Sequence, residues 1–143
     1  MNARYTRHVA SDHEMLIEAL QRTAKALPDV DLLVLFGSRA GGSARAGSDV
    51  DVAVALNGRS ADVRRAVEVA LARAVRAPMD VSFLDTAPPQ LRFEIARSGV
   101  SLFERTHGAW TRERARAMVD WWDWAPLARR IHDRAVARLR TEA

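Results

Sequence analysis

The sequence contains no cysteine. The chain can therefore form no disulfide, no thiolate nucleophile and no cysteine-ligated metal site. It also has no apolar run near the roughly 20 residues that a membrane-spanning helix needs, and its N-terminal residues lack the apolar core of a signal peptide. We therefore expect a cytoplasmic protein that does not contact a membrane.

Lysine is almost missing, because Lys25 is the one lysine among 22 basic residues. Arginine forms forked contacts with phosphates, so this bias could indicate nucleic-acid binding. However, the arginines are scattered along the chain and mixed with 18 acidic residues, whereas binding patches are clustered. We attribute the bias to codon usage and expect no direct contact with nucleic acid.

At 143 residues, 48% hydrophobic and 28% charged, the chain is typical of one globular domain and leaves little room for a second, substrate-binding domain. We expect a single domain over residues 1–143 with a C-terminal helical extension from about residue 109 to 143.

Apolar periodicity and turn residues predict alternating helices and strands. A capping box from Ser11 to Glu14 predicts the start of the first helix, which ends before Pro28. The expected fold is α/β (α+β), a small mixed β-sheet flanked by helices. The predicted strands are 31–36, 50–56, 79–84 and 100–103, and the predicted helices are 11–27, 63–76, 89–98 and 110–140, the last with a break at Pro126.

The stretch LFGSRAGGSARAGSDVDVAV, residues 35–54, gathers most of the glycines, and residues 37–49 read as a loop with at most one short helical turn. It is not a P-loop, because Ser43 and Ala44 occupy the positions that require Lys and Ser/Thr. It also has no Gly-x-Gly-x-x-Gly register. Both familiar nucleotide-binding loops are therefore excluded here.

The loop nevertheless has the chemistry of a phosphate site. Gly37 follows a buried strand and lets a ligand approach the backbone, and Ser38 offers a hydroxyl and an amide at a helix start. These two residues suit a triphosphate. Arg39 could reach a phosphate or remain solvated, and Ser48 could bind the nucleotide or support the strand that follows.

Acidic residues gather just after this loop. Asp49 and Asp51 alternate along one strand, so both point to the same face, where they repel each other unless a cation is present. Asp80 opens the next strand and faces away from its apolar neighbours. Three carboxylates suit Mg²⁺, and two such ions roughly 3.5–4 Å apart could clamp an in-line displacement at phosphorus.

The segment GSRAGGSARAGSDVD resembles the GSx10DxD signature of the DNA polymerase beta-like nucleotidyltransferase superfamily. Among its members, so short a chain most resembles the minimal nucleotidyltransferase (MNT) antitoxins of HEPN/MNT toxin–antitoxin pairs. The resemblance implies the polymerase beta-like fold, with Asp49 and Asp51 as ligands of both Mg²⁺ ions, Asp80 as ligand and base, and Gly37 and Ser38 on the triphosphate of ATP.

The same resemblance implies a reaction and a partner. An MNT antitoxin transfers AMP from ATP to a tyrosine hydroxyl of its cognate HEPN RNase toxin and so disables it, which also implies a hetero-oligomer of the two proteins. One alternative is a small-molecule nucleotidyltransferase of the aminoglycoside type, although such enzymes carry a further acceptor domain. Another is a non-catalytic antitoxin that blocks its toxin sterically, against which the three intact aspartates argue.

Three tryptophans stand close together in the last predicted helix. At about 100° per residue, Trp122 and Trp124 point about 160° apart, so one core-facing stripe cannot bury Trp121, Trp122 and Trp124 together. Either another element covers the odd one, or it is offered to a partner protein. The four histidines show no metal-binding spacing.

Overall fold

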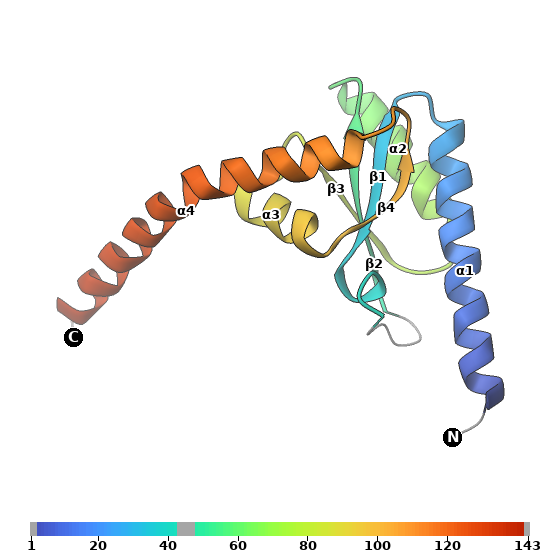
Figure 1. Cartoon of the computed structure of the whole chain (residues 1–143), viewed down its shortest axis with the longest axis horizontal. Coiled ribbons are helices and arrows are strands. Elements are labelled where there is room, and N and C mark those ends of the chain that lie inside the picture. Colours follow the sequence, from blue (N-terminus) through green and yellow to red (C-terminus); the bar gives the residue numbers. More distant parts are fainter. Residues whose placement is uncertain (1–2, 43–47, 142–143) are drawn as a thin grey trace.

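The computed structural model describes residues 3–42 and 48–141, with side chains from residue 12 onward. A four-stranded mixed sheet forms the centre of the molecule (Figure 1). Strand β1 pairs antiparallel with β2 and β4, whereas β2 and β3 are parallel. The predicted fold class is therefore confirmed. In the sheet order β3-β2-β1-β4, the strands are Met79–Phe83, Val50–Leu56, Val30–Phe36 and Val100–Glu104.

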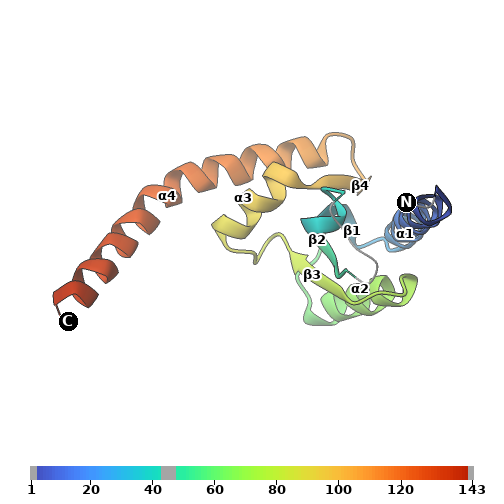
Figure 2. The same cartoon turned by 90° about the horizontal axis from the view of Figure 1, so that it is seen from below.

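Helices cover both faces of the sheet (Figures 1 and 2). Side chains of α1 and α2 join the core cluster on one face, and side chains of α3 and α4 join the cluster on the other. In addition, a 3-10 turn, η1, follows β1 directly. In chain order these elements are α1 (Ala3–Ala26), η1 (Gly37–Arg39), α2 (Ala61–Ala74), α3 (Pro89–Ser98) and α4 (Ala109–Thr141).

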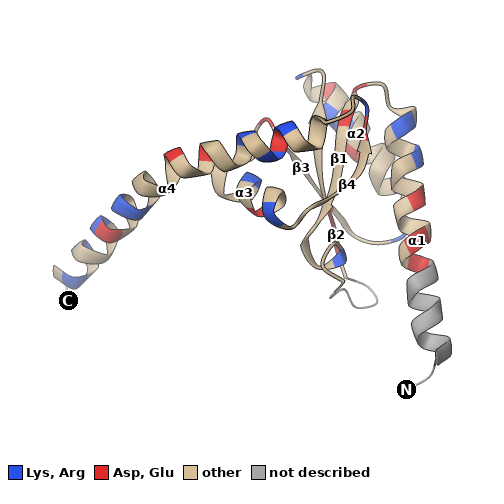
Figure 3. Cartoon of the chain, viewed as in Figure 1, with Lys and Arg blue, Asp and Glu red and all other residues tan. Residues whose placement is uncertain are grey.

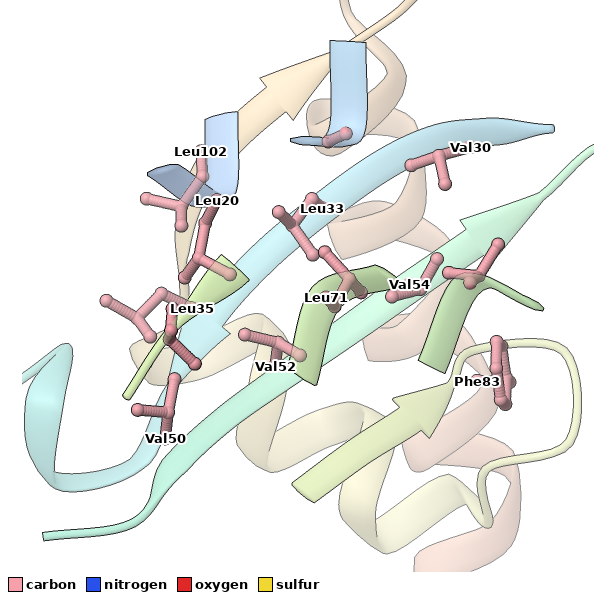
Figure 4. Close-up of a cluster of buried hydrophobic side chains, with 13 residues drawn as sticks. Leu20, Val30, Leu33, Leu35, Val50, Val52, Val54, Leu71, Phe83 and Leu102 are labelled. Atoms are coloured by element: carbon pink, nitrogen blue, oxygen red, sulfur yellow. The ribbon is translucent and has the colours of Figure 1, made fainter. Parts of the chain in front are cut away.

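Strand β1 is buried on both faces, as its unbroken apolar sequence predicts. Leu33 and Leu35 pack into the larger cluster, which Figure 4 shows between the sheet and the helices on its side. Leu32 and Val34 point the other way and pack near Ile95 of α3. Packing on both faces fixes the position of the sheet, so the ends of its strands can hold polar groups in defined positions.

The end of β4 is tied to the end of α1 by one side chain. The guanidinium of Arg105 donates hydrogen bonds to the carbonyl oxygens of Ala24 (3.3 Å), Leu27 (2.8 Å) and Val30 (2.8 Å). The carbonyls of Ala24 and Leu27 also accept the backbone amides of Leu27 and Val30, so Arg105 adds a second donor to each at the end of α1 and the following turn.

The predicted start of the first helix is wrong. Helix α1 begins at Ala3, so the capping box at residues 11–14 lies inside it. The motif serves amides that lack a helical partner, but residues 3–10 are themselves helical and supply carbonyls to those amides.

The predicted break at Pro126 is also wrong, because α4 continues through it to Thr141. A proline inside a helix removes one hydrogen bond and pushes against the carbonyl four residues earlier, which bends a helix without necessarily ending it. Figure 1 shows such a change of direction along α4. No helix in the described part of the chain is apolar enough over its length to cross a membrane.

Candidate functional site

The predicted site residues lie where β1 ends and β2 and β3 begin. Asp51 stands opposite Phe36 of β1 and opposite Asp80 of β3. Directly paired residues on parallel strands share a face of the sheet, about 4.8 Å apart along the hydrogen-bonding direction. The sheet therefore places the carboxylates of Asp51 and Asp80 side by side.

Asp49 completes the group from the position immediately before β2. It is exposed, and strand alternation directs it to the same face as Asp51. Burial raises the pKa of the half-buried Asp51 carboxyl, and the negative charges of Asp80 and Asp49 raise this pKa further. All three causes oppose the ionised form of Asp51, so the site favours the arrival of positive charge.

These residues fit a hard cation that brings part of its own coordination. Carboxylate oxygens are the protein ligands of Mg²⁺, which usually keeps waters and takes further oxygens from substrate phosphates. Within the described ranges, no three metal-binding side chains are already close enough to form a complete site. Mg²⁺ at this site stays a prediction, which rests on the carboxylate chemistry of the three aspartates.

Gly37 lies against the central carboxylate. Its φ of 72° is in the left-handed region, and a Cβ atom built on it would collide with Oδ2 of Asp51. A side chain at this position would be strained by the backbone and would push the carboxylate away. Glycine thus allows η1 to turn directly over Asp51. The exposed Ser38 follows within this turn, at the outer surface of the site.

Arg39 connects the two ends of the loop between η1 and β2. Its Nε and Nη2 groups both donate hydrogen bonds to the backbone carbonyl of Ser48, at 3.0 Å and 2.6 Å. That carbonyl belongs to the residue immediately before Asp49, so Arg39 fixes the chain as it enters the acidic strand. Gly47, part of the glycine cluster noted in the sequence, lies outside the described residues.

This role of Arg39 was missed by sequence reasoning, which weighed only a phosphate contact against solvation. The acceptor is a main-chain carbonyl, and a main-chain acceptor leaves no trace in residue type or spacing. The half-buried Ser48 therefore contributes its backbone to the site's geometry.

The sequence from residue 18 to residue 108 matches the family model described as polymerase beta, nucleotidyltransferase, which covers more than half of the chain. The chain belongs to this family. The match contains every site residue named above and ends just before α4. The predicted nucleotidyltransferase fold is thereby confirmed.

Solved structures share the nucleotidyltransferase fold over most of their length. A chain of a toxin–antitoxin crystal structure with AMP-PNP is 22% identical with a TM-score of 0.69, and the match covers 87% of this chain and 98% of that one. A chain from a complex of a tri-AMPylated Shewanella oneidensis HEPN toxin with an MNT antitoxin is 20% identical with a TM-score of 0.65, covering 89% and 98%. No curated protein matches the sequence significantly.

Proposed function

We propose that this nucleotidyltransferase is an antitoxin that transfers AMP from ATP to a tyrosine hydroxyl of a cognate HEPN RNase toxin and so neutralises it. The observation that carries the proposal is the crowding of Asp49, Asp51 and Asp80 beside the Gly37 turn in a nucleotidyltransferase domain. The fold shared with chains of toxin–antitoxin complexes, one with AMP-PNP and one with a tri-AMPylated toxin, supports the choice of substrate and partner.

The three aspartates would hold two Mg²⁺ ions, which when bound neutralise phosphate charge and lower the pKa of a coordinated hydroxyl. Gly37 allows the triphosphate to approach the backbone, and Ser38 offers its amide and hydroxyl to a phosphate oxygen. Arg39, through the Ser48 carbonyl, keeps the entry to the acidic strand in place.

In the proposed transfer, the tyrosine oxygen bonds to the α-phosphorus of ATP while the bond from that phosphorus to the bridging oxygen breaks and pyrophosphate leaves. Asp80 accepts the hydroxyl proton. It suits this role because it is exposed on β3, an edge strand that a protein acceptor can approach, whereas Asp51 is half-buried between its neighbours.

The test uses the purified HEPN protein encoded beside this chain, incubated with this chain, Mg²⁺ and ATP labelled at the α-phosphate. We expect label on the HEPN protein and a mass increase of AMP on a tyrosine peptide. ATP labelled at the γ-phosphate is the matched control and should leave no label, because that phosphate departs with pyrophosphate. Absence of label from α-labelled ATP would refute protein AMPylation.

A second measurement separates transfer from steric block. The RNase activity of the HEPN protein is measured after incubation with this chain, with or without ATP, followed by removal of this chain. A covalent mark predicts that inhibition persists only in the sample that received ATP. Full recovery in both samples would instead support an antitoxin that acts by binding alone.

A further inference from the structure

One face of α4 packs against α3. Arg92 of α3 lies between two carboxylates of α4, with 3.1 Å from Nη2 to Oε1 of Glu113 and 2.5 Å from Nη1 to Oδ2 of Asp120. Phe93 stacks on Trp121 with ring centroids 4.8 Å apart, and Trp121 contacts Trp124 at 5.5 Å. These contacts define the α3-facing side of α4.

The same side continues beyond α3, which has 10 residues where α4 has 33. We call residues 125–141 of α4 the distal arm. At about 100° per residue, Leu127, Ile131 and Leu139 all lie within about 60° of Trp124 around the helix. Their exposed fractions are 48%, 58% and 69%, so this apolar row has no cover in the described chain.

The bend of α4 turns the distal arm toward this same side. Pro126 lies about 160° from Trp124 around the helix, on the opposite face. A proline pushes against the carbonyl of the preceding turn and opens the helix on its own side, so the helix bends toward the other side. Figures 1 and 2 both show the distal arm turning toward the side on which α3 lies.

A row of positive charge runs beside the apolar row. Arg130, Arg134 and Arg138 are spaced four residues apart, so they lie along one side of the helix next to Leu127 and Ile131. Residues 125–141 contain five arginines and one aspartate. Figure 3 shows this excess of blue over red on the distal arm.

We propose that the distal arm docks a helix of the partner protein, one whose apolar seam is flanked by carboxylates. Resting on the proposed function, this inference assigns the surface that recognises the HEPN toxin. The apolar row has large side chains separated by Ala128 and Ala135, and this alternation of knobs and holes accepts a second helix. Carboxylates four residues apart on that helix would face the arginine row.

Two other occupants fit less well. In an antiparallel pair, a second copy of the chain would bring its arginine row against the first one. In a parallel pair the row would meet the other flank of the apolar row, which carries His132 and Arg129 and no carboxylate, so neither orientation offers the arginines a negative partner. A flat membrane surface would have to touch α3 before reaching the row, because α3 stands on the same side of α4. A single helix fits beyond the end of α3.

The experiment measures the dissociation constant between the full chain and the purified HEPN protein encoded beside it, by calorimetry. Ile131→Asp should weaken binding about 30-fold or more, the size of an interface hot spot. Two matched controls should change it less than about threefold: Trp122→Asp, which is 69% exposed on the opposite face of α4, and Met15→Asp, which is 64% exposed on α1. Circular dichroism checks that each variant keeps its helix content.

Each outcome decides the matter. Unchanged binding by Ile131→Asp, or an equal loss in Trp122→Asp, would overturn the proposed surface. The proposal would also be overturned if Ile131→Asp kept its affinity for the toxin but lost dimerisation in sedimentation, or lost binding to vesicles that contain anionic lipid. AMP transfer by the unaltered chain is measured separately. If the unaltered chain transfers AMP but Ile131→Asp binds the toxin normally, the proposed surface is refuted and the proposed function stands. If Ile131→Asp binds the toxin weakly but the unaltered chain transfers no AMP, the surface stands and the function is refuted.

Discussion

Two groups of charged side chains in this molecule are built in opposite ways. Between α3 and α4, one guanidinium is held by two carboxylates, those of Glu113 and Asp120 around Arg92. At the start of β2, carboxylates gather around the carboxylate of Asp51. Arg116, 3.6 Å from Glu113, adds a second positive charge, so the first group balances its own charge and joins two helices. The second group leaves charge for a ligand to balance.

The shifts in pKa report this difference. Burial lowers the pKa of Arg92, but its hydrogen bonds to Asp120 and Glu113 and the charges of both outweigh burial and raise it. At Asp51, burial and both neighbouring charges act in one direction and oppose ionisation. A cluster in which every influence is unfavourable to its own charge indicates binding rather than stability.

The largest effect is expected from removing the Asp51 carboxylate, which is central to the acidic group at the start of β2. Asp51→Ala should lower the rate of AMP transfer on the order of a thousandfold or more, because a metal clamp supplies several kcal/mol to the transition state. Glu68→Gln, an exposed carboxylate on α2, is the control and should transfer normally. Undiminished transfer by Asp51→Ala, followed with α-labelled ATP, would refute the site.

Substitutions in the charged group between α3 and α4 should change the stability of the fold. Glu113→Gln should lower the free energy of unfolding by about 3 kcal/mol, because the buried Glu113 carboxylate is the ionic partner of Arg92, whose side chain is only 13% exposed. Asp120→Asn is the matched control, and because the Asp120 side chain is 41% exposed it should cost about 1 kcal/mol or less. Urea unfolding measures both, and equal losses would contradict the importance of burial.

Two glycines distinguish a contact with the site from backbone strain alone. Gly37 and Gly42 have φ of 72° and 73°, so Ala at either should cost about 1–2 kcal/mol of stability. A Cβ meets Asp51 only at Gly37, whereas at Gly42 it meets nothing within 4 Å. Gly37→Ala should therefore also slow transfer about 100-fold, as a displaced catalytic group does. Equal rates in the two variants would contradict this close approach.

The smallest effect concerns pH. Because the pKa of Asp51 is raised on folding, its contribution favours the folded state at low pH and is lost as pH rises from the unfolded value near 3.8 through the raised value. Asp51→Asn removes the charge, so it should raise the melting temperature slightly at pH 7 and leave it unchanged at pH 3, where the carboxyl is protonated in both states. A lower melting temperature at pH 7 would reverse the assigned sign.

The strands and the acidic cluster could be predicted because their causes are local in sequence. The apolar run ending at Phe36 predicts a strand buried on both faces, and alternation places Asp49 and Asp51 together. The register of β2 with β3 then brings Asp80 opposite Asp51. The roles of these residues in catalysis stay predictions.

The features that sequence reasoning missed depend on contacts that residue type does not encode. Arg39 binds a main-chain carbonyl across a loop, and Pro126 is tolerated inside a helix that bends around it. The prediction for the tryptophans is partly successful. Helical geometry predicts that one of the three cannot lie on the same core-facing side of the helix as the other two. The structure identifies it as Trp122, which is 69% exposed, while Trp121 packs on Phe93.

The hydrogen bonds of Arg105 have a consequence for synthesis on the ribosome. They tie the end of α1 to a residue 78 to 81 positions later, and the cluster around Ile95 likewise includes Trp110. Neither face of the sheet is therefore complete while only the first strands have been made, because Leu102 joins one cluster and Ile95 the other. At roughly 5–20 residues per second, translation reaches Arg105 after about 5–20 s, during which the face of β1 and β2 that packs on Ile95 stays uncovered. We expect nascent chains stalled before this residue to be the preferred targets of chaperones and proteases.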